Sequence, residues 1–235
     1  LELLDLNKNS VEEGVQYLGS MLSANNHLKS LTLAFMNSIT DEGLKSLVEG
    51  LRENEQLALL DLRDNEIGVD GARELADLLR FSPPLIHLFL SENRDIKTEG
   101  AIELFNALVS NDVLETLHLS SCRISPDAGP AIYGALTHFP QEGEVASLSV
   151  LKELDLSFNS LGSKGGEMIG KGLRRNKALV FLNLNANRLG PVGAHKLSYG
   201  LYTINKLLTT SPSGHHTRVS DKKLEKVKHD KEYLR

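Results

Sequence analysis

Three residue types that hydrolases combine for nucleophilic catalysis, serine, histidine and aspartate, occupy related places in this sequence. His118 and Ser120 lie in the segment LETLHLSSC, and Asp155 takes the place of His118 in the similar segment LKELDLSFN. Equivalent residues of neighbouring parallel strands lie about 4.8 Å apart. Two such strands would therefore bring the three side chains to one face, and one hypothesis for that face is a Ser–His–Asp triad.

The rest of the sequence does not support this hypothesis. A triad also needs a strained turn at the nucleophile, an oxyanion hole and an enclosed pocket, and the sequence around Ser120 has the pattern of none of them. We therefore interpret the three residues as polar members of a binding surface, and we predict that the chain is not an enzyme.

Metal and cofactor chemistry has equally little support. His87 and His118 stand in staggered positions without a second carboxylate or a cysteine that converges on them, and His215 and His216 lie in a polar segment. Because a metal site needs three or four such ligands, we predict none. The phosphate-binding patterns GxxxxGK[ST] and GxGxxG do not occur, so we expect no nucleotide or other cofactor.

The elements that must position these residues are seven copies of one pattern. The copies begin with the segments LELLDLNKN, LKSLTLAFMN, LALLDLRDN, LIHLFLSEN, LETLHLSSC, LKELDLSFN and LVFLNLNAN, at residues 1, 28, 57, 85, 114, 151 and 179. Their starts lie 27 to 29 residues apart, except for 37 residues between Leu114 and Leu151. A fixed period of this length is typical of a repeat protein, in which each unit packs on its neighbours.

Each copy predicts one strand followed by one helix. The leading segment alternates apolar with polar residues, which is typical of a strand. The trailing segment places apolar residues four and eight positions after a small residue, as in Gly165, Ile169 and Leu173, which is typical of a helix. We therefore expect short parallel strands that are joined through helices on one side of the sheet.

Composition and charge limit the classes of partner. Apolar residues make up 40% of the 235 residues, tryptophan is absent and the formal net charge is −5. Residues 1–202 hold 18 Lys and Arg against 27 Asp and Glu, whereas residues 203–235 hold 8 against 4. An acidic array argues against nucleic-acid binding, and no apolar run is long enough to predict a membrane span.

Leu1 already occupies the first consensus position, so we expect that further sequence precedes it.

The repeat resembles the ribonuclease-inhibitor type of leucine-rich repeat, with the pattern LxxLxLxxN/CxL and a helix in about 28 residues. The resemblance covers roughly residues 1–205. It implies an α/β right-handed solenoid, a horseshoe segment of seven repeats with a parallel sheet on the concave side and helices on the convex side. It also implies that in six of the seven turns one side chain points inward and supports the turn, namely Asn9, Asn65, Asn93, Cys122, Asn159 and Asn187. Repeat two departs from this pattern, because Met36 stands at the consensus position and Asn37 one residue later, so we expect a wider turn there. A buried apolar thiol has little thiolate character, so Cys122 is interpreted as structural.

The outward strand positions and their rims provide the candidate partner-binding residues. We expect one central apolar patch of Leu59, Ile86 and Phe89, with Phe35 near its edge, and a second patch of Phe158, Val180 and Phe181. Exposed apolar side chains with a charged rim are typical of protein interfaces. The full set of candidates is Phe35, Leu59, Asp61, Arg63, Ile86, His87, Phe89, His118, Asp155, Phe158, Val180 and Phe181.

The pattern fails after residue 205. Residues 206–218, which include SPSGHH, are predicted to form a linker. Residues 219–235 are predicted to form a basic amphipathic helical tail, because Leu224, Val227 and Leu234 make an apolar stripe among lysines.

We predict a non-enzymatic protein–protein interaction module, or a scaffold subunit of a larger intracellular assembly such as a cytoskeletal or ciliary one. Its protein partner would bind the concave face, with the basic tail as a second contact. Nucleic acid, membrane insertion and small-molecule ligands are not expected. The single cysteine favours a reducing compartment and hence a cytoplasmic location, with the cytoskeleton or the cilium as possible sites within it.

Two alternatives stay open. One is a GTPase activator similar to the Ran GTPase-activating protein, a family that adds an acidic tail where this tail is basic. The other is the ligand-sensing array of a NOD-like receptor, which an upstream nucleotide-binding domain would identify.

Overall fold

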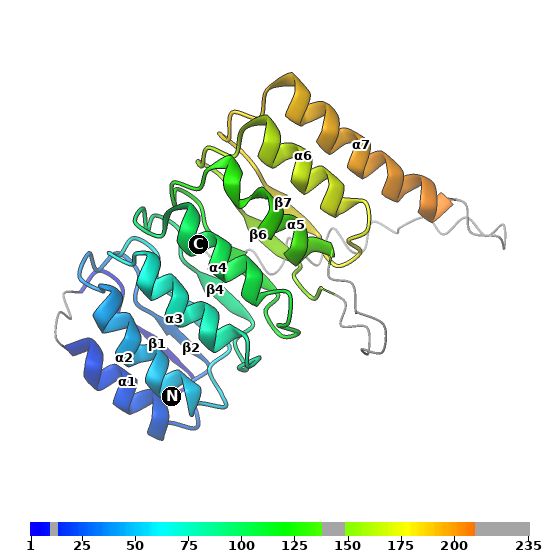
Figure 1. Cartoon of the computed structure of the whole chain (residues 1–235). Helices are drawn as coiled ribbons and strands as arrows, with labels where there is room; N and C mark the ends of the chain where they lie inside the picture. The colour runs from blue at the N-terminus through cyan, green and yellow to red at the C-terminus, as the bar shows by residue number, and fades with distance from the viewer. Residues whose placement is uncertain (10–13, 138–148, 210–235) are drawn as a thin grey trace.

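The protein is a right-handed α/β solenoid built from one parallel sheet and one layer of helices (Figure 1). The computed structural model describes residues 1–9, 14–137 and 149–209, with side chains described up to Tyr202. Seven parallel strands pair in chain order: β1 (Leu3–Asp5), β2 (Ser30–Thr32), β3 (Leu59–Asp61), β4 (His87–Phe89), β5 (Thr116–His118), β6 (Glu153–Asp155) and β7 (Phe181–Asn183).

A helix follows each strand and lies on the same side of the sheet as the other helices (Figure 1). The helices are α1 (Val15–Ala24), α2 (Asp41–Arg52), α3 (Val69–Leu79), α4 (Lys97–Ala107), α5 (Gly129–Thr137), α6 (Gly162–Leu173) and α7 (Gly190–Thr209), with a 3₁₀ turn η2 (Pro126–Ala128) before α5. Among the described residues, no helix lies on the other face of the sheet, the concave wall.

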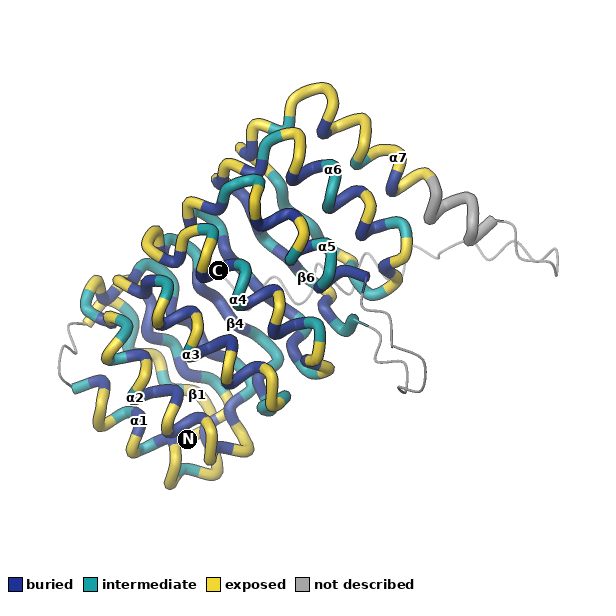
Figure 2. Tube along the Cα trace, in the orientation of Figure 1, coloured by how far each residue is buried: buried dark blue, intermediate teal, exposed yellow. Residues whose placement is uncertain are grey.

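The core lies between the sheet and the helices and runs through the whole array (Figure 2). The middle residue of every strand is a leucine, and in β2 to β6 this leucine is fully buried: Leu31, Leu60, Leu88, Leu117 and Leu154. Burying one such side chain stabilises the folded chain by roughly 2 kcal/mol relative to leaving it exposed. Leu4 in β1 and Leu182 in β7 are only partly buried, because each outer strand has a neighbour on one side only.

The turn side chains predicted from the resemblance hydrogen-bond to the backbone of two repeats. Asn65 Nδ2 donates to the carbonyls of Leu33 in the preceding repeat and Leu62 in its own, at 2.8 and 3.1 Å. Asn93, Asn159 and Asn187 make the same pair of bonds. Asn9, in the first repeat, donates within its own repeat to Leu6 and Asn7.

Cys122 occupies the same turn position with a thiol. Its Sγ lies 3.4 Å from the carbonyl oxygen of Leu90 in the preceding repeat. Burial raises the pKa of the Cys122 thiol to about 12. A thiol with that pKa is protonated at neutral pH and is a poor nucleophile.

A second asparagine row, which the sequence analysis missed, supports the return from each helix to the next strand. Asn54, Asn111 and Asn176 are buried, and each donates from Nδ2 to a carbonyl of the preceding repeat, that of Leu22, Leu79 or Leu136. Each also accepts, through Oδ1, from the N–H of the leucine that opens the next strand segment. The signal was present in the sequence as an asparagine three residues before Leu57, Leu114 and Leu179.

The last described helix runs past the array boundary predicted at residue 205. Helix α7 continues to Thr209, so the first residues of the segment predicted as a linker belong to this helix. The rest of that segment and the basic tail at 219–235 lie outside the described residues, as does most of the extra sequence between Leu136 and Leu151.

Candidate protein-binding surface on the concave wall

The sheet register places the outward strand residues in two rows across the concave wall. The first row is Leu3, Ser30, Leu59, His87, Thr116, Glu153 and Phe181, and the second is Asp5, Thr32, Asp61, Phe89, His118, Asp155 and Asn183. His118 is therefore the direct neighbour of both Phe89 and Asp155, as predicted from the spacing of the repeats.

Four side chains near the middle of these rows form the central cluster: Arg63, His87, Phe89 and His118. The Arg63 guanidinium lies 5.7 Å from the centre of the Phe89 ring, and His118 meets that ring edge to face at 4.8 Å. Asp61 holds Arg63 in place by accepting hydrogen bonds from Nε at 2.9 Å and Nη2 at 2.6 Å. These bonds raise the pKa of Arg63, so its guanidinium stays charged as one half of an ion pair with Asp61.

Phe89 differs from its prediction as an exposed aromatic anchor. Its side chain is only 8% exposed, because Arg63, His87 and His118 surround its ring. The half-buried side chains of Leu59, Ile86 and His87 provide the accessible apolar surface in this region instead. Phe89 therefore acts mainly as a support for its neighbours.

Ser120, His118 and Asp155 lie on one face but do not form a triad. Asp155 Oδ1 accepts a 2.7 Å hydrogen bond from Ser157 Oγ, and Asp155 Oδ2 accepts a 3.0 Å hydrogen bond from Asn183. Ser120 Oγ bonds to Ser157 Oγ at 2.9 Å. Within the described residues, His118 Nε2 is buried without a hydrogen-bond partner, so no base contacts the serine that would act as the nucleophile.

The histidines also do not form a metal site. His87 Nδ1 bonds to Thr116 Oγ1 at 2.9 Å, and the group nearest to His118 Nε2 that could pair with it is Glu153, at 3.9 Å. In the described part of the chain, no three histidine, cysteine, aspartate or glutamate side chains gather closely enough to hold an ion.

Burial of these histidines predicts a pH dependence of stability. Desolvation is the main cause that lowers the pKa of both His87 and His118 below the ordinary 6.5. It outweighs the carboxylates of Glu115 and Glu153 near His87, and those of Asp155 and Glu153 near His118. The unfolded chain then binds protons more readily than the native state. The stability that the neutral histidines contribute is complete above pH 6.5 and is lost as the pH falls through their folded-state pKa values.

We expect a lower urea midpoint at pH 5.5 than at pH 7.5, and a smaller difference in the His118→Gln variant. His27→Gln is the control, because His27 is exposed and lies outside the cluster. An unchanged pH difference in His118→Gln would contradict this assignment.

The second predicted patch is divided between two rims of the wall. We define the turn rim as Lys8, Phe35, Asp64, Glu92, Ser121, Phe158 and Ala186, in which each N–H up to that of Phe158 donates to the carbonyl just before the next rim residue. We define the return rim as Glu2, Lys29, Ala58, Ile86, Glu115, Lys152 and Val180, whose residues hydrogen-bond to one another through the backbone. Phe158 belongs to the turn rim, Val180 belongs to the return rim, and Phe181 lies on the wall next to Val180. The prediction of one continuous patch was therefore wrong, because the rims lie on the order of 15–20 Å apart along the strands.

The return rim carries charges that are largely paired. Lys29 pairs with Glu2 at 2.9 Å, and Lys152 pairs with Glu115. Ile86 lies between Ala58 and Glu115 on this rim and is half-buried. An apolar residue between exposed ion pairs is compatible with a contact at the edge of an interface.

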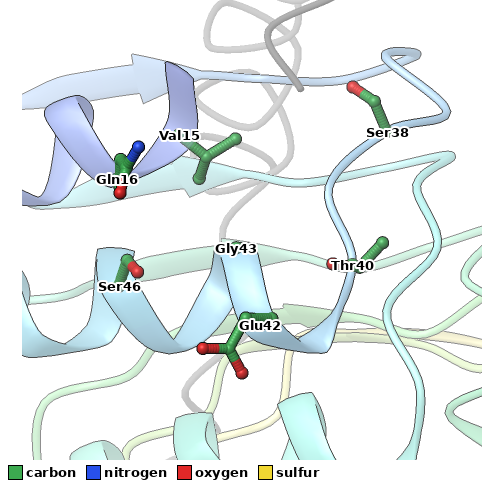
Figure 3. A pocket seen from close by; sticks show the side chains of 7 residues that line it. All are labelled: Val15, Gln16, Ser38, Thr40, Glu42, Gly43 and Ser46. Atoms are coloured by element: carbon green, nitrogen blue, oxygen red, sulfur yellow. The ribbon is translucent and has the colours of Figure 1, made fainter. Parts of the chain in front are cut away.

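One open hollow lies away from the wall, between α1 and the start of α2 (Figure 3). Polar and small side chains such as Gln16, Ser38 and Thr40 line it, and its single titratable side chain is that of Glu42. One carboxylate alone provides neither an acid–base pair nor a metal site.

Among the described helices, none is both long and apolar enough to cross a bilayer.

Comparison with known proteins agrees with the repeat structure. A family model described as a leucine-rich repeat matches residues 24–48, 57–76, 110–132 and 147–170, and it describes a repeat rather than an enzyme. "NACHT, LRR and PYD domains-containing protein 12" of Mus musculus is 34% identical over 177 residues, which cover 74% of this chain and 16% of that protein. Ribonuclease inhibitor of Sus scrofa is 33% identical over 164 residues, covering 69% of this chain and 34% of the inhibitor.

A solved structure shares the fold. The tropomodulin C-terminal domain of Caenorhabditis elegans superposes with a TM-score of 0.51 at 16% identity, covering 86% of this chain and 99% of that domain. The chain spans between about one sixth and one third of the length of the two relatives above. With seven repeats in one parallel sheet, the chain belongs to the leucine-rich-repeat family, in its ribonuclease-inhibitor type.

Proposed function

We propose that this chain is a protein-binding module whose concave wall, centred on the central cluster and Leu59, receives a protein partner. The observation that carries the proposal is a wall that no described helix covers, on which half-buried apolar and aromatic side chains, those of Leu59, His87 and Phe181, stand in one register row. Solenoid walls of this kind are extended and preformed surfaces, so binding requires little reorganisation.

The charges of the wall indicate the chemistry of the partner. Glu153 and Asp155 lie beside Phe181 and Asn183 in the register, whereas Arg63 is neutralised by its pair with Asp61. A partner that contributes apolar side chains and at least one cationic group would complement this surface.

Substitutions on the two faces of the array test the proposal. With the intact chain immobilised, we expect Leu59→Glu and Ile86→Asp each to reduce the retained partner at least tenfold, because a carboxylate would be desolvated in the interface. Tyr17→Asp is the control, since Tyr17 is exposed on α1, on the convex side. Phe89→Asp is a poor probe, because it would bury a charge in the wall itself.

Equal retention by Leu59→Glu, Ile86→Asp and the unchanged chain would contradict the proposal. If this chain stimulated GTP hydrolysis by Ran, the alternative function, that of a GTPase activator, would replace this proposal.

The wider role that we propose is that of a non-enzymatic scaffold subunit in an intracellular assembly, with cytoskeletal and ciliary assemblies as candidates. The buried free thiol of Cys122 supports a reducing compartment. The net positive charge of residues 203–235 supports a second contact with an acidic surface.

A second candidate is the sensing array of a larger receptor. The match to a Mus musculus protein named for its NACHT, LRR and PYD domains favours it. Reading the full-length transcript tests this candidate, because a nucleotide-binding domain ahead of the array would support it.

A further inference from the structure

The turn rim has a backbone feature that repeats along the whole array. In all seven repeats its residue adopts a left-handed conformation, with φ between 52° and 66°. Asparagine, aspartate and glycine tolerate this conformation, whereas a bulky side chain raises its free energy. Two repeats nevertheless place phenylalanine here, Phe35 at φ 60° and Phe158 at φ 53°.

Neither phenylalanine is compensated by burial. Phe158 is 60% exposed, and within the described residues its ring has no aromatic or cationic contact. Phe35 is 39% exposed, with Lys8 and Arg63 5.8 and 5.7 Å from its ring centre. These two phenylalanines strain the backbone without gaining much burial in return. They therefore point to a contact with another molecule rather than to a role in stabilising the free chain.

The rim between the two rings is short and acidic. Phe35 and Phe158 belong to the second and sixth strand-and-helix units, four strand spacings apart, which corresponds to about 19 Å. Asp64, Glu92 and Ser121 lie between them. In the described part of the chain Asp64 forms no ion pair, and Glu92 pairs with the exposed Arg94 at 3.4 Å.

We propose that the turn rim binds an extended segment of a partner protein that carries two apolar side chains six positions apart, with at least one Lys or Arg between them. Six residues of extended chain span about 20 Å, and an even spacing directs both side chains to the same side. In a helix, side chains that share a face at a similar distance would be about 11 or 14 positions apart rather than six. The inference rests on the proposed function and names the chemistry of the partner at one edge of the same wall.

Selection from a displayed library of random twelve-residue peptides, with the intact chain as target, tests the inference. We expect the recovered peptides to share two apolar residues six positions apart with a basic residue between them. Phe35→Ala and Phe158→Asn should each weaken binding of such a peptide at least tenfold. Phe81→Ala is the matched control, because Phe81 is 78% exposed and follows α3 at the return side of the array.

Thermal unfolding separates loss of binding from loss of fold. The melting temperature of Phe158→Asn should equal or exceed that of the unchanged chain, since asparagine favours the left-handed backbone. Peptides without the six-residue spacing, or equal loss of binding in Phe81→Ala, would overturn the inference. Peptides that depend on Leu59 but not on Phe35 or Phe158 would also overturn it, while leaving the proposed concave site in place. Failure to recover any peptide would count against the turn rim alone, because a folded partner could still bind the wall.

Discussion

Replacing Asn159 by alanine is expected to destabilise the array by about 3 kcal/mol. Its Nδ2 donates to the carbonyls of Leu119 and Leu156 at 2.8 and 3.0 Å, and its Oδ1 accepts from the N–H groups of Cys122 and Ile124 at 3.1 and 2.9 Å. Alanine would leave the Leu119 carbonyl and the N–H groups of Cys122 and Ile124 without this partner, at roughly 1–3 kcal/mol for each unsatisfied group, reduced where the chain can relax. The Leu156 carbonyl keeps its hydrogen bond from Asn187 Nδ2. Urea unfolding followed by circular dichroism measures the effect.

The matched control is Asn9→Ala. Asn9 has the same turn position in the first repeat, but it is exposed, and among the described residues its side chain bonds to Leu6 and Asn7 of its own repeat. Its replacement should change the free energy of unfolding by no more than about 0.5 kcal/mol. If both variants lose the same stability, the asparagine row does not couple the repeats.

The second large effect is expected from glycine to alanine substitution between α1 and α2. A Cβ atom at Gly50 would lie 2.0 Å from the carbonyl oxygen of Gly19, and one at Gly19 would lie 2.1 Å from the carbonyl oxygen of Ser46. Because these contacts are with backbone, no side-chain rotation relieves them and the helices must separate. We expect Gly50→Ala to lower stability by about 2 kcal/mol, measured by thermal or urea unfolding.

Gly134→Ala in α5 should raise the stability of the protein rather than lower it. The nearest atom to its Cβ would be Val109 Cγ2 at 3.7 Å, an ordinary contact. Alanine should then stabilise the helix by about 0.5–1 kcal/mol through its higher helix propensity. If Gly50→Ala also stabilised the protein, the close approach of α1 and α2 would be refuted.

The sequence predicted the repeats, the parallel register and the turn side chains because each of these follows from periodic leucines and from one residue at a fixed place. In every copy, the leucine three positions after the opening leucine has the same place in the strand. Leu60 and Leu88 could therefore be assigned to the core from the sequence. The predicted neighbours of His118 followed from the same register.

Exposure could not be predicted in the same way. Whether Phe89 faces solvent depends on how far Arg63 and His118 reach across from adjacent strands, and a strand pattern does not encode that. The separation of Phe158 from Val180 arises because the residues leave their strands at opposite ends. The pairing of Ser157 with Asp155, which replaces any triad, depends on rotamers rather than on spacing.

The central claim is that a protein partner occupies the concave wall, and site-specific photo-cross-linking tests it most directly. A photoreactive phenylalanine analogue would replace Phe181 on the wall in one sample and Tyr17 on the convex side in another, both in the intact chain. We predict cross-links to the retained partner from position 181 and few or none from position 17. Cross-links from position 17 alone would contradict the proposal.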